Sequence, residues 1–202
     1  MKLEVPFEWK TKKLNQVSKV TIGLVTTMTE NYVSSGVPLI RNSDIKENKI
    51  LKSRLIKLET SFANQYPTRV LLRDDIVTVH TGDVGVSSVI DEELEGCFGF
   101  ATLNTRVDKS KLYPQFLCWY FNSSAFLAYA VSLSTGDGRR NLNLKDFSKS
   151  PVPVPPLLEQ IKIAEILSTW DNAINTVQKL LANSQQQKKA LMQQLLTGKK
   201  RF

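Results

Sequence analysis

The side chains of this sequence that carry reactive groups are few and lie far apart along the chain. His80 is the single histidine, and Cys97 and Cys118 have no spacing typical of metal ligands. A histidine-activated nucleophile, or a metal site with several histidines, would need residues from another chain. The sequence therefore predicts no catalytic residue, no metal site and no cofactor bound by this chain.

Short motifs do not change that prediction. Glu47-Asn48-Lys49 matches the end of a nuclease Glu-x-Lys signature, but three letters match by chance and Asp44 lies too close to be the usual partner. No Walker phosphate loop occurs. Gly82-x-x-Gly85 and Gly136-x-Gly138 lack a following strand–helix phosphate unit, so turns explain them better.

Residues suited to recognition are more numerous, and they gather in three segments. Each segment follows a predicted strand or lies in a glycine-containing loop. Arginine binds guanine edges or phosphates, and asparagine pairs with adenine through two hydrogen bonds. The sequence predicts that double-stranded DNA is contacted by Arg41, Asn42, Lys46, Lys49, Arg54, Thr78, His80, Thr81, Arg139, Arg140, Asn141 and Asn143.

Each of these segments also has a purely structural interpretation. Arg41 and Asp44 can pair with each other or cap a turn. His80 can be a packed, hydrogen-bonded side chain of the core. Arg139 and Arg140 can be solvated charges without a partner.

The charge distribution supports a polyanionic partner. The chain has 202 residues and a formal net charge of +8. This excess divides equally between residues 1–155 and the much shorter segment 156–202. One basic face is therefore plausible, and DNA is the polyanion that the arginines and asparagines fit.

The first three quarters of the chain contain short elements of mixed type. Residues 37–41, 76–79 and 87–90 are predicted strands, each bounded by Gly, Asp or Asn. Residues 114–130 are one or two predicted helices packed by aromatic side chains, with a break or N-cap at Asn122-Ser123-Ser124. This combination indicates an α+β globular domain over residues 1–150.

A proline-rich segment, residues 151–156, separates this domain from a different pattern. Four of its six residues are proline, so a stiff connector is predicted. Residues 157–202 then form a predicted long helix with a heptad stripe that is interrupted at Ser184 and Lys188. The apolar positions are Ile163, Leu167, Trp170, Ile174, Val177, Leu181, Leu191 and Leu195.

The stripe requires a partner helix. About 40 residues at 1.5 Å each give a rod of roughly 60 Å, longer than the predicted domain is wide. We expect the second helix to come from a second copy of the chain or from another protein. The alternative is that the helix folds back across its own domain.

The sequence also indicates the cellular compartment in which the protein is expected. No apolar run of membrane-spanning length occurs, and the N-terminus has no secretory pattern. Cys97 and Cys118 are expected to be two buried thiols, with a disulfide as the alternative. A cytoplasmic protein without a membrane partner is therefore expected.

The order of several motifs is similar to that of a known family. They are Phe7-Glu8-Trp9-Lys10-x-x-Lys13-Leu14, Pro38-Leu39-Ile40-Arg41-x-x-Asp44-Ile45, Asp74-Asp75-Ile76-Val77 with Gly82-x-x-Gly85, and the loop from Gly136 to Leu144. The most specific is Val152-Pro153-Val154-Pro155-Pro156-Leu157-x-Glu159-Gln160-x-x-Ile163-Ala164-x-x-Leu167, followed by Leu191-Met192-Gln193-Gln194-Leu195-Leu196-Thr197-Gly198-Lys199. The chain resembles one half of the specificity subunit of Type I restriction–modification enzymes.

The resemblance implies a target-recognition domain followed by a conserved long helix, a unit that usually occurs twice in one chain. Such a subunit chooses the DNA sequence, while a modification subunit binds S-adenosylmethionine and methylates adenine and a restriction subunit cleaves. With one unit present, we expect a homodimer that recognises a split, palindromic target and docks modification subunits. A coiled-coil scaffold protein, a half of a split subunit and a truncated remnant remain alternatives.

Overall fold

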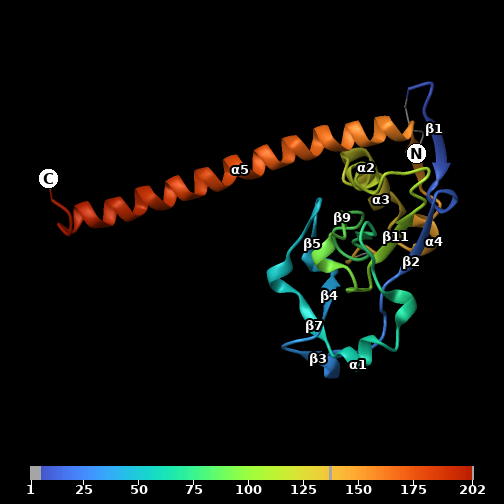
Figure 1. Cartoon of the computed structure of the whole chain (residues 1–202), viewed down its shortest axis with the longest axis horizontal. Coiled ribbons are helices and arrows are strands. Elements are labelled where there is room, and N and C mark those ends of the chain that lie inside the picture. The colour runs from blue at the N-terminus through green and yellow to red at the C-terminus, as the bar shows by residue number, and fades with distance from the viewer. Residues whose placement is uncertain (1–5, 137, 202) are drawn as a thin grey trace. The chain divides into compact units, whose positions relative to one another are not determined.

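The computed structural model describes residues 6–136 and 138–201, and in that part of the chain two four-stranded sheets organise the N-terminal region (Figure 1). One sheet is antiparallel with the order β2 (Ser18–Ile22), β11 (Leu103–Val107), β8 (Ile76–Thr78), β9 (Ser87–Val89). The other has the order β10 (Phe98–Phe100), β4 (Val37–Arg41), β7 (Ile56–Leu58), β3 (Tyr32–Val33), and its β10–β4 pair is parallel. Two small pairs complete the strands: β1 (Lys10–Lys13) with β12 (Pro151–Val154), and the hairpin β5 (Ile45–Lys46) with β6 (Lys49–Ile50).

Helical segments connect and cover these strands. The α-helices are α1 (Thr60–Ala63), α2 (Pro114–Phe121), α3 (Ser124–Leu133), α4 (Leu144–Phe147) and α5 (Leu157–Leu196). Short 3₁₀ turns are η1 (Leu14–Gln16), η2 (Thr29–Asn31), η3 (Asn42–Asp44), η4 (Lys52–Arg54), η5 (Pro67–Arg69) and η6 (Glu92–Leu94). The α+β prediction is confirmed, and the predicted strands at 37–41, 76–79 and 87–90 correspond to β4, β8 and β9.

The break between α2 and α3 has a local cause. The Ser123 hydroxyl accepts a hydrogen bond from the Phe126 amide at 3.3 Å, which caps α3 as predicted. The Asn122 side chain donates to the Ser87 carbonyl and accepts from the Ser87 amide, both at 2.9 Å, and so attaches the break to β9. Among the described residues no single helix is both long and apolar enough to cross a membrane. Only α2 and α3 taken together, with 69° between them, reach that length and composition.

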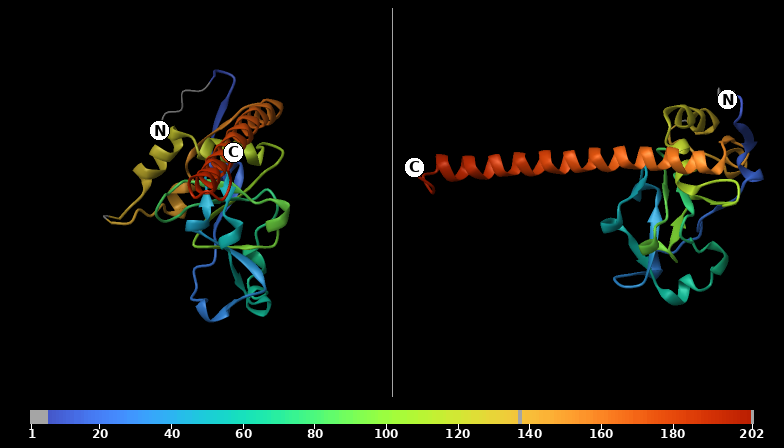
Figure 2. Two further views of the ribbon diagram at one scale, coloured as in Figure 1. Left: turned by 90° about the vertical axis from the view of Figure 1, so that its left-hand side faces the viewer. Right: turned by 45° about the horizontal axis from the view of Figure 1, so that its top comes forward.

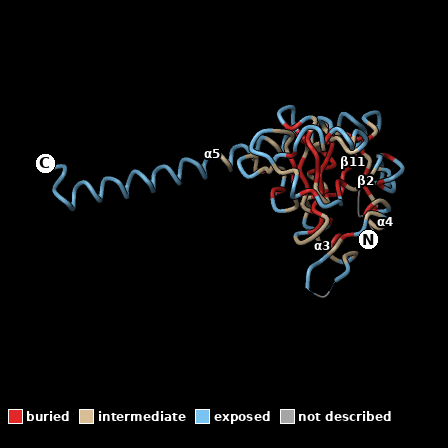
Figure 3. The backbone as a smooth tube through the Cα atoms, turned by 90° about the horizontal axis from the view of Figure 1, so that it is seen from below, coloured by how far each residue is buried: buried red, intermediate tan, exposed pale blue. Residues whose placement is uncertain are grey.

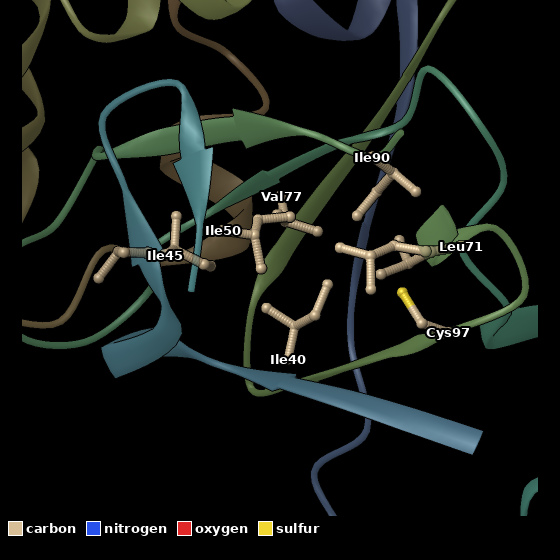
Figure 4. Packing of buried hydrophobic residues seen from close by; sticks show 9 residues of the cluster. Ile40, Ile45, Ile50, Leu71, Val77, Ile90 and Cys97 are labelled. Carbon is tan, nitrogen blue, oxygen red and sulfur yellow. The ribbon is translucent and has the colours of Figure 1, made fainter. Parts of the chain in front are cut away.

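Strand β4 is buried on both faces because alternate side chains enter different clusters. Ile40 packs with Ile45, Ile50, Leu71, Val77, Val79, Ile90, Leu94 and Cys97, the cluster of Figure 4. Its neighbour Leu39 enters a second cluster with Leu24, Met28, Leu58, Ala63 and Phe98. This arrangement explains why the segment reads as an almost continuous apolar run.

The proline-rich segment differs from the predicted connector. Residues 151–154 form β12, which pairs with β1 in the register Lys12 with Val152 and Lys10 with Val154. Proline lacks an amide donor, but alternate residues of an antiparallel edge strand need none for the ladder. This segment is therefore part of the first folded unit and not a free linker.

Gln160 extends that unit into the first turn of α5. Its side chain is fully buried, donates to the carbonyls of Lys111 and Pro155 at 2.9 Å each, and accepts from the Tyr113 amide at 2.8 Å. The neighbouring Glu159 accepts a hydrogen bond from the Trp9 indole at 3.3 Å. These contacts give the Glu159-Gln160 dipeptide a structural role, because a buried amide must have its hydrogen bonds satisfied.

The chain divides between Ile161 and Lys162 into two compact units, so the boundary lies later than the predicted one. The second unit consists mainly of the remainder of α5, which is continuous to Leu196 (Figure 2). Shortly after the helix ends, Gly198 adopts a left-handed backbone conformation with φ 70°, as is common where helices end. Most of α5 is exposed (Figure 3). Many of its apolar side chains are exposed as well, among them Leu167 at 39% and Trp170 at 68%.

Candidate nucleic-acid interface

Arg41 is bound to a buried carboxylate at the end of β4. Its Nε and Nη2 donate to Asp44 Oδ2 and Oδ1 at 2.9 and 3.0 Å, and its Nη2 also donates to the Arg54 carbonyl at 3.1 Å. Asp44 is 1% exposed and also accepts from the Arg41 amide. The hydrogen bonds to Asp44 raise the pKa of the Arg41 guanidinium. The structure therefore favours the ion-pair interpretation over a free base contact.

This pair leads to a prediction about stability. Replacing Arg41 with alanine should leave the buried Asp44 charge without its partner and lower the free energy of unfolding by about 3 kcal/mol. Arg73→Ala is the matched control, because the Arg73–Glu92 pair is exposed on both sides and should change stability by less than about 0.5 kcal/mol. Urea unfolding followed by circular dichroism measures both, and equal losses would contradict this assignment.

Asn42 and His80 are joined inside the first unit. Asn42 Oδ1 accepts from the His80 amide at 2.8 Å, and Asn42 Nδ2 donates to the Ala101 carbonyl at 3.3 Å. His80 Nδ1 lies 2.7 Å from the carbonyl oxygen of Leu142. Both side chains thus hold backbone segments together, which agrees with the structural interpretation of His80.

Thr78 lies in the interior of its sheet. It is fully buried, and its hydroxyl is 2.8 Å from the hydroxyl of Ser87 on the neighbouring strand β9. A side chain in this place does not reach solvent, so the predicted DNA contact at Thr78 is corrected. Strand alternation alone did not reveal this, because both faces of β8 are covered.

Lys46 and Lys49 are the exposed strand residues of the hairpin β5–β6, whose other two strand residues are buried. They are directly paired across the two strands, and Asn48 in the turn has φ 54°. Two like charges at opposed positions destabilise a hairpin unless an anion lies between or near them. Arg54 is exposed close to this hairpin in the sequence. Nearby Lys52 is different, because Asp91 and Glu93 pair with it.

The second exposed basic segment is the arginine loop, residues 135–141, of which residue 137 lies outside the described residues. Arg139 and Arg140 are exposed, and no ion pair within the described part of the chain includes them. Asn141 forms backbone bridges with both Thr81 and Thr135. Asn143 is exposed at the N-cap of α4, without a side-chain capping bond. Of the predicted residues, this loop brings together Thr81, Arg139, Arg140 and Asn141.

Three lysines on β1 were missed by sequence reasoning. Lys10, Lys12 and Lys13 are exposed, and no ion pair among the described residues includes them. The signal was available, since three of the four residues of Lys10–Lys13 are basic. They add to the exposed cations of the first unit.

The two cysteine thiols of the first unit are enclosed. Cys97 and Cys118 are free and buried, as predicted, and burial raises the pKa of the Cys97 thiol to about 12. Burial also raises the pKa of the Cys118 thiol. Such thiols are not nucleophiles at neutral pH. Within the described residues no group of His, Cys, Asp or Glu has the arrangement of a metal site.

The family of the chain follows from a comparison with protein-family models. The model described as "Type I restriction modification DNA specificity domain" matches residues 6–183. The chain belongs to this family. It is 26% identical over 201 residues to the putative type I restriction enzyme MjaX specificity subunit of Methanocaldococcus jannaschii, with 96% of this chain and 47% of that protein covered. The EcoBI specificity subunit of Escherichia coli is 23% identical over 197 residues, with 96% and 42% covered.

Solved structures agree with the specificity-domain fold. A chain from a structural study of complex assembly and conformational transition of the type I R-M system has a TM-score of 0.70 at 20% identity, covering 95% of this chain and 45% of that one. The HsdS subunit from Thermoanaerobacter tengcongensis has a TM-score of 0.65 at 19% identity, covering 95% and 49%. The present chain therefore spans about half the length of the specificity subunits it matches.

Proposed function

We propose that this chain is a non-catalytic DNA sequence-recognition subunit of a Type I restriction–modification complex. The observation that carries the proposal is the specificity-domain match over residues 6–183. Exposed cations on the hairpin β5–β6, on η4 and in the arginine loop support contact with DNA: Lys46, Lys49, Arg54, Arg139 and Arg140. Modification and restriction subunits would supply the chemistry, and this chain would dock the modification subunits.

We further propose that the chain acts as a homodimer on a split, palindromic target. The support is the apolar seam of α5, which consists of Ile163, Leu167, Trp170, Ile174, Val177, Leu181, Leu191 and Leu195. All of these except the half-buried Ile163 are exposed in the single chain. A second copy with two-fold symmetry would cover this seam and present two identical recognition units.

Charge favours an antiparallel arrangement of the two helices. Residues 157–178 carry three acidic side chains and one basic, whereas residues 179–201 carry six basic side chains and no acidic one. Parallel helices would place the basic halves side by side. Antiparallel helices instead place each acidic half beside a basic half, which lowers the electrostatic energy.

The polar interruption of the seam favours one antiparallel register. In an antiparallel pair of helices, each a position of one heptad repeat packs against a d position of the other helix. If the two helices cross near Lys179, each of the ten seam positions, Ser184 and Lys188 included, faces a seam position of the second copy. Lys188 then lies against Trp170 of the second copy, and Ser184 against Ile174. A lysine over an indole gains a cation–π interaction, and its stem covers the apolar ring. This register tolerates both polar residues.

DNA binding through the hairpin can be tested by its salt dependence. Lys49→Ala should remove one phosphate contact from each copy and therefore two from a dimer. Each lost contact makes the negative slope of log K against log salt shallower by about 0.9, so the magnitude of the slope should fall by about 2. Fluorescence anisotropy with duplexes selected by the wild-type chain from a random-sequence pool measures the slope.

The control for net charge is Lys109→Ala, because Lys109 is already paired with Asp74 at 2.6 Å. It removes the same charge and should leave the slope unchanged. Equal slopes for both variants and the wild type would refute a hairpin contact. Failure of the wild-type chain to bind any duplex, with or without modification subunits, would favour a scaffold protein or a truncated remnant.

A further inference from the structure

The arginine loop is closed at its base by backbone hydrogen bonds. The amide and carbonyl groups of Thr135 and Asn141 exchange two bonds, at 3.0 and 2.9 Å. The Gly82 amide donates to the Arg140 carbonyl at 3.1 Å. Gly136 permits the tight turn: its φ is 109°, and a Cβ atom there would lie 2.5 Å from the Arg139 carbonyl oxygen. The loop therefore has a defined base against residues 81–82.

His80 adds a second attachment immediately after this base. Its carbonyl accepts from the Leu142 amide at 2.9 Å, and its Nδ1 lies 2.7 Å from the Leu142 carbonyl oxygen. A carbonyl oxygen only accepts, so Nδ1 carries the proton, whichever charge state the ring has. Leu142 itself is fully buried and anchors this end of the loop in the core.

The position of His80 is in turn fixed by Asn42. The His80 amide donates to Asn42 Oδ1 at 2.8 Å, and Asn42 Nδ2 donates to the Ala101 carbonyl at 3.3 Å. A continuous series of hydrogen bonds thus connects Ala101, Asn42, His80 and Leu142. This series links the end of the loop to η3 and to the turn after β10.

The attachment of this loop affects binding because the loop carries two exposed arginines, Arg139 and Arg140. An arginine that is ordered only upon binding loses rotamer freedom, and a mobile backbone adds its own entropy to that loss. A loop whose base is already held by hydrogen bonds avoids part of this backbone cost. Affinity for a structured polyanion then depends on groups that never touch it.

We propose that His80 is a positioning residue that fixes the arginine loop for contact with DNA, and that it makes no base contact itself. The proposal rests on the DNA-binding function proposed above. Asn42 acts one step further away, by holding the His80 backbone. His80 and Asn42, which were predicted from the sequence to contact DNA, thereby receive a different role.

Three substitutions of His80 separate hydrogen bonding from ring packing. Asparagine places an amide donor near the position of Nδ1, glutamine places it near Nε2, and alanine removes it. His80→Ala and His80→Gln should weaken binding of the selected duplex about tenfold, while His80→Asn should retain most of the affinity. Hydrogen exchange of the Asn141 and Leu142 amides should accelerate in the two weak variants and not in His80→Asn. If His80→Ala does not fold, the other two variants carry the same comparison.

A double-mutant cycle with Arg139→Ala/Arg140→Ala tests whether His80 acts through the loop. In that background, His80→Gln should have almost no further effect on affinity, because the groups that it positions are gone. Additive losses, or equal affinity of all three His80 variants, would overturn the positioning role while leaving DNA binding intact. A wild-type chain that binds no duplex refutes the proposed function as well as this inference.

Discussion

Replacing Leu167 and Ile174 with lysine should convert the chain from a dimer to a monomer. Both side chains lie in the apolar seam and are 39% and 53% exposed in the single chain. Complete burial of a leucine or isoleucine contributes about 1.5–3 kcal/mol, and about half of that remains to be gained here, so four lost side chains per dimer remove about 3–6 kcal/mol. A micromolar dimer has only about 8 kcal/mol of association free energy. Sedimentation equilibrium at micromolar concentration measures the mass.

The matched control places the same charges on the opposite side of the helix. Asn172 and Gln186 are exposed and lie at outward heptad positions. Asn172→Lys/Gln186→Lys therefore adds the same two lysines without touching the seam, and the dimer should persist. A seam variant that keeps the wild-type mass would refute the seam assignment, and a wild-type monomer would refute the homodimer.

Patterns that are local in sequence predicted the elements well. The apolar runs and flanking residues of 37–41 and 76–79 identified β4 and β8, and the Asn122-Ser123-Ser124 segment identified the break before α3. The heptad steps identified α5, although the helix ends at Leu196 and not at the predicted residue 202. In each case the signal and the structure involve the same few neighbouring residues.

Partners that are distant in sequence could not be predicted. His80 meets Leu142 across 62 positions, and the strand pairing of β12 with β1 joins the two ends of the first unit. Residue type told us that His80 and Arg41 have donors, but not which acceptors they meet. Hydrogen bonds to buried backbone or carboxylate groups occupy such donors within the folded chain, so these donors are not free for another ligand.

The same contrast explains which predicted cations remain candidates. A lysine near acidic residues in space is neutralised, as Lys52 is by Asp91 and Glu93, which are about 40 positions away. Lys46 and Lys49 have each other as cross-strand neighbours instead. Their mutual repulsion is relieved by a polyanion, so this pair has the physical character expected of a phosphate contact.

Cysteine cross-linking should identify the antiparallel register of α5. With the helix pair centred near Lys179, residue 167 of one copy lies opposite residue 191 of the other. A chain carrying Leu167→Cys and Leu191→Cys should therefore form covalent dimers under mild oxidation, with the linkage identified by mass spectrometry. The native thiols are buried and should not compete.

The single variants make this test discriminating. In the proposed register the two copies of residue 167 are 24 residues apart along the helix axis, about 36 Å, so Leu167→Cys alone should form no disulfide. A parallel pair would instead link residue 167 to itself. A shift of one heptad would link 167 to 184, which Leu167→Cys/Ser184→Cys detects. The register also sets the distance along the helix axis between the two copies of Leu157, where α5 begins, and in a homodimer this distance would contribute to the separation of the half-sites.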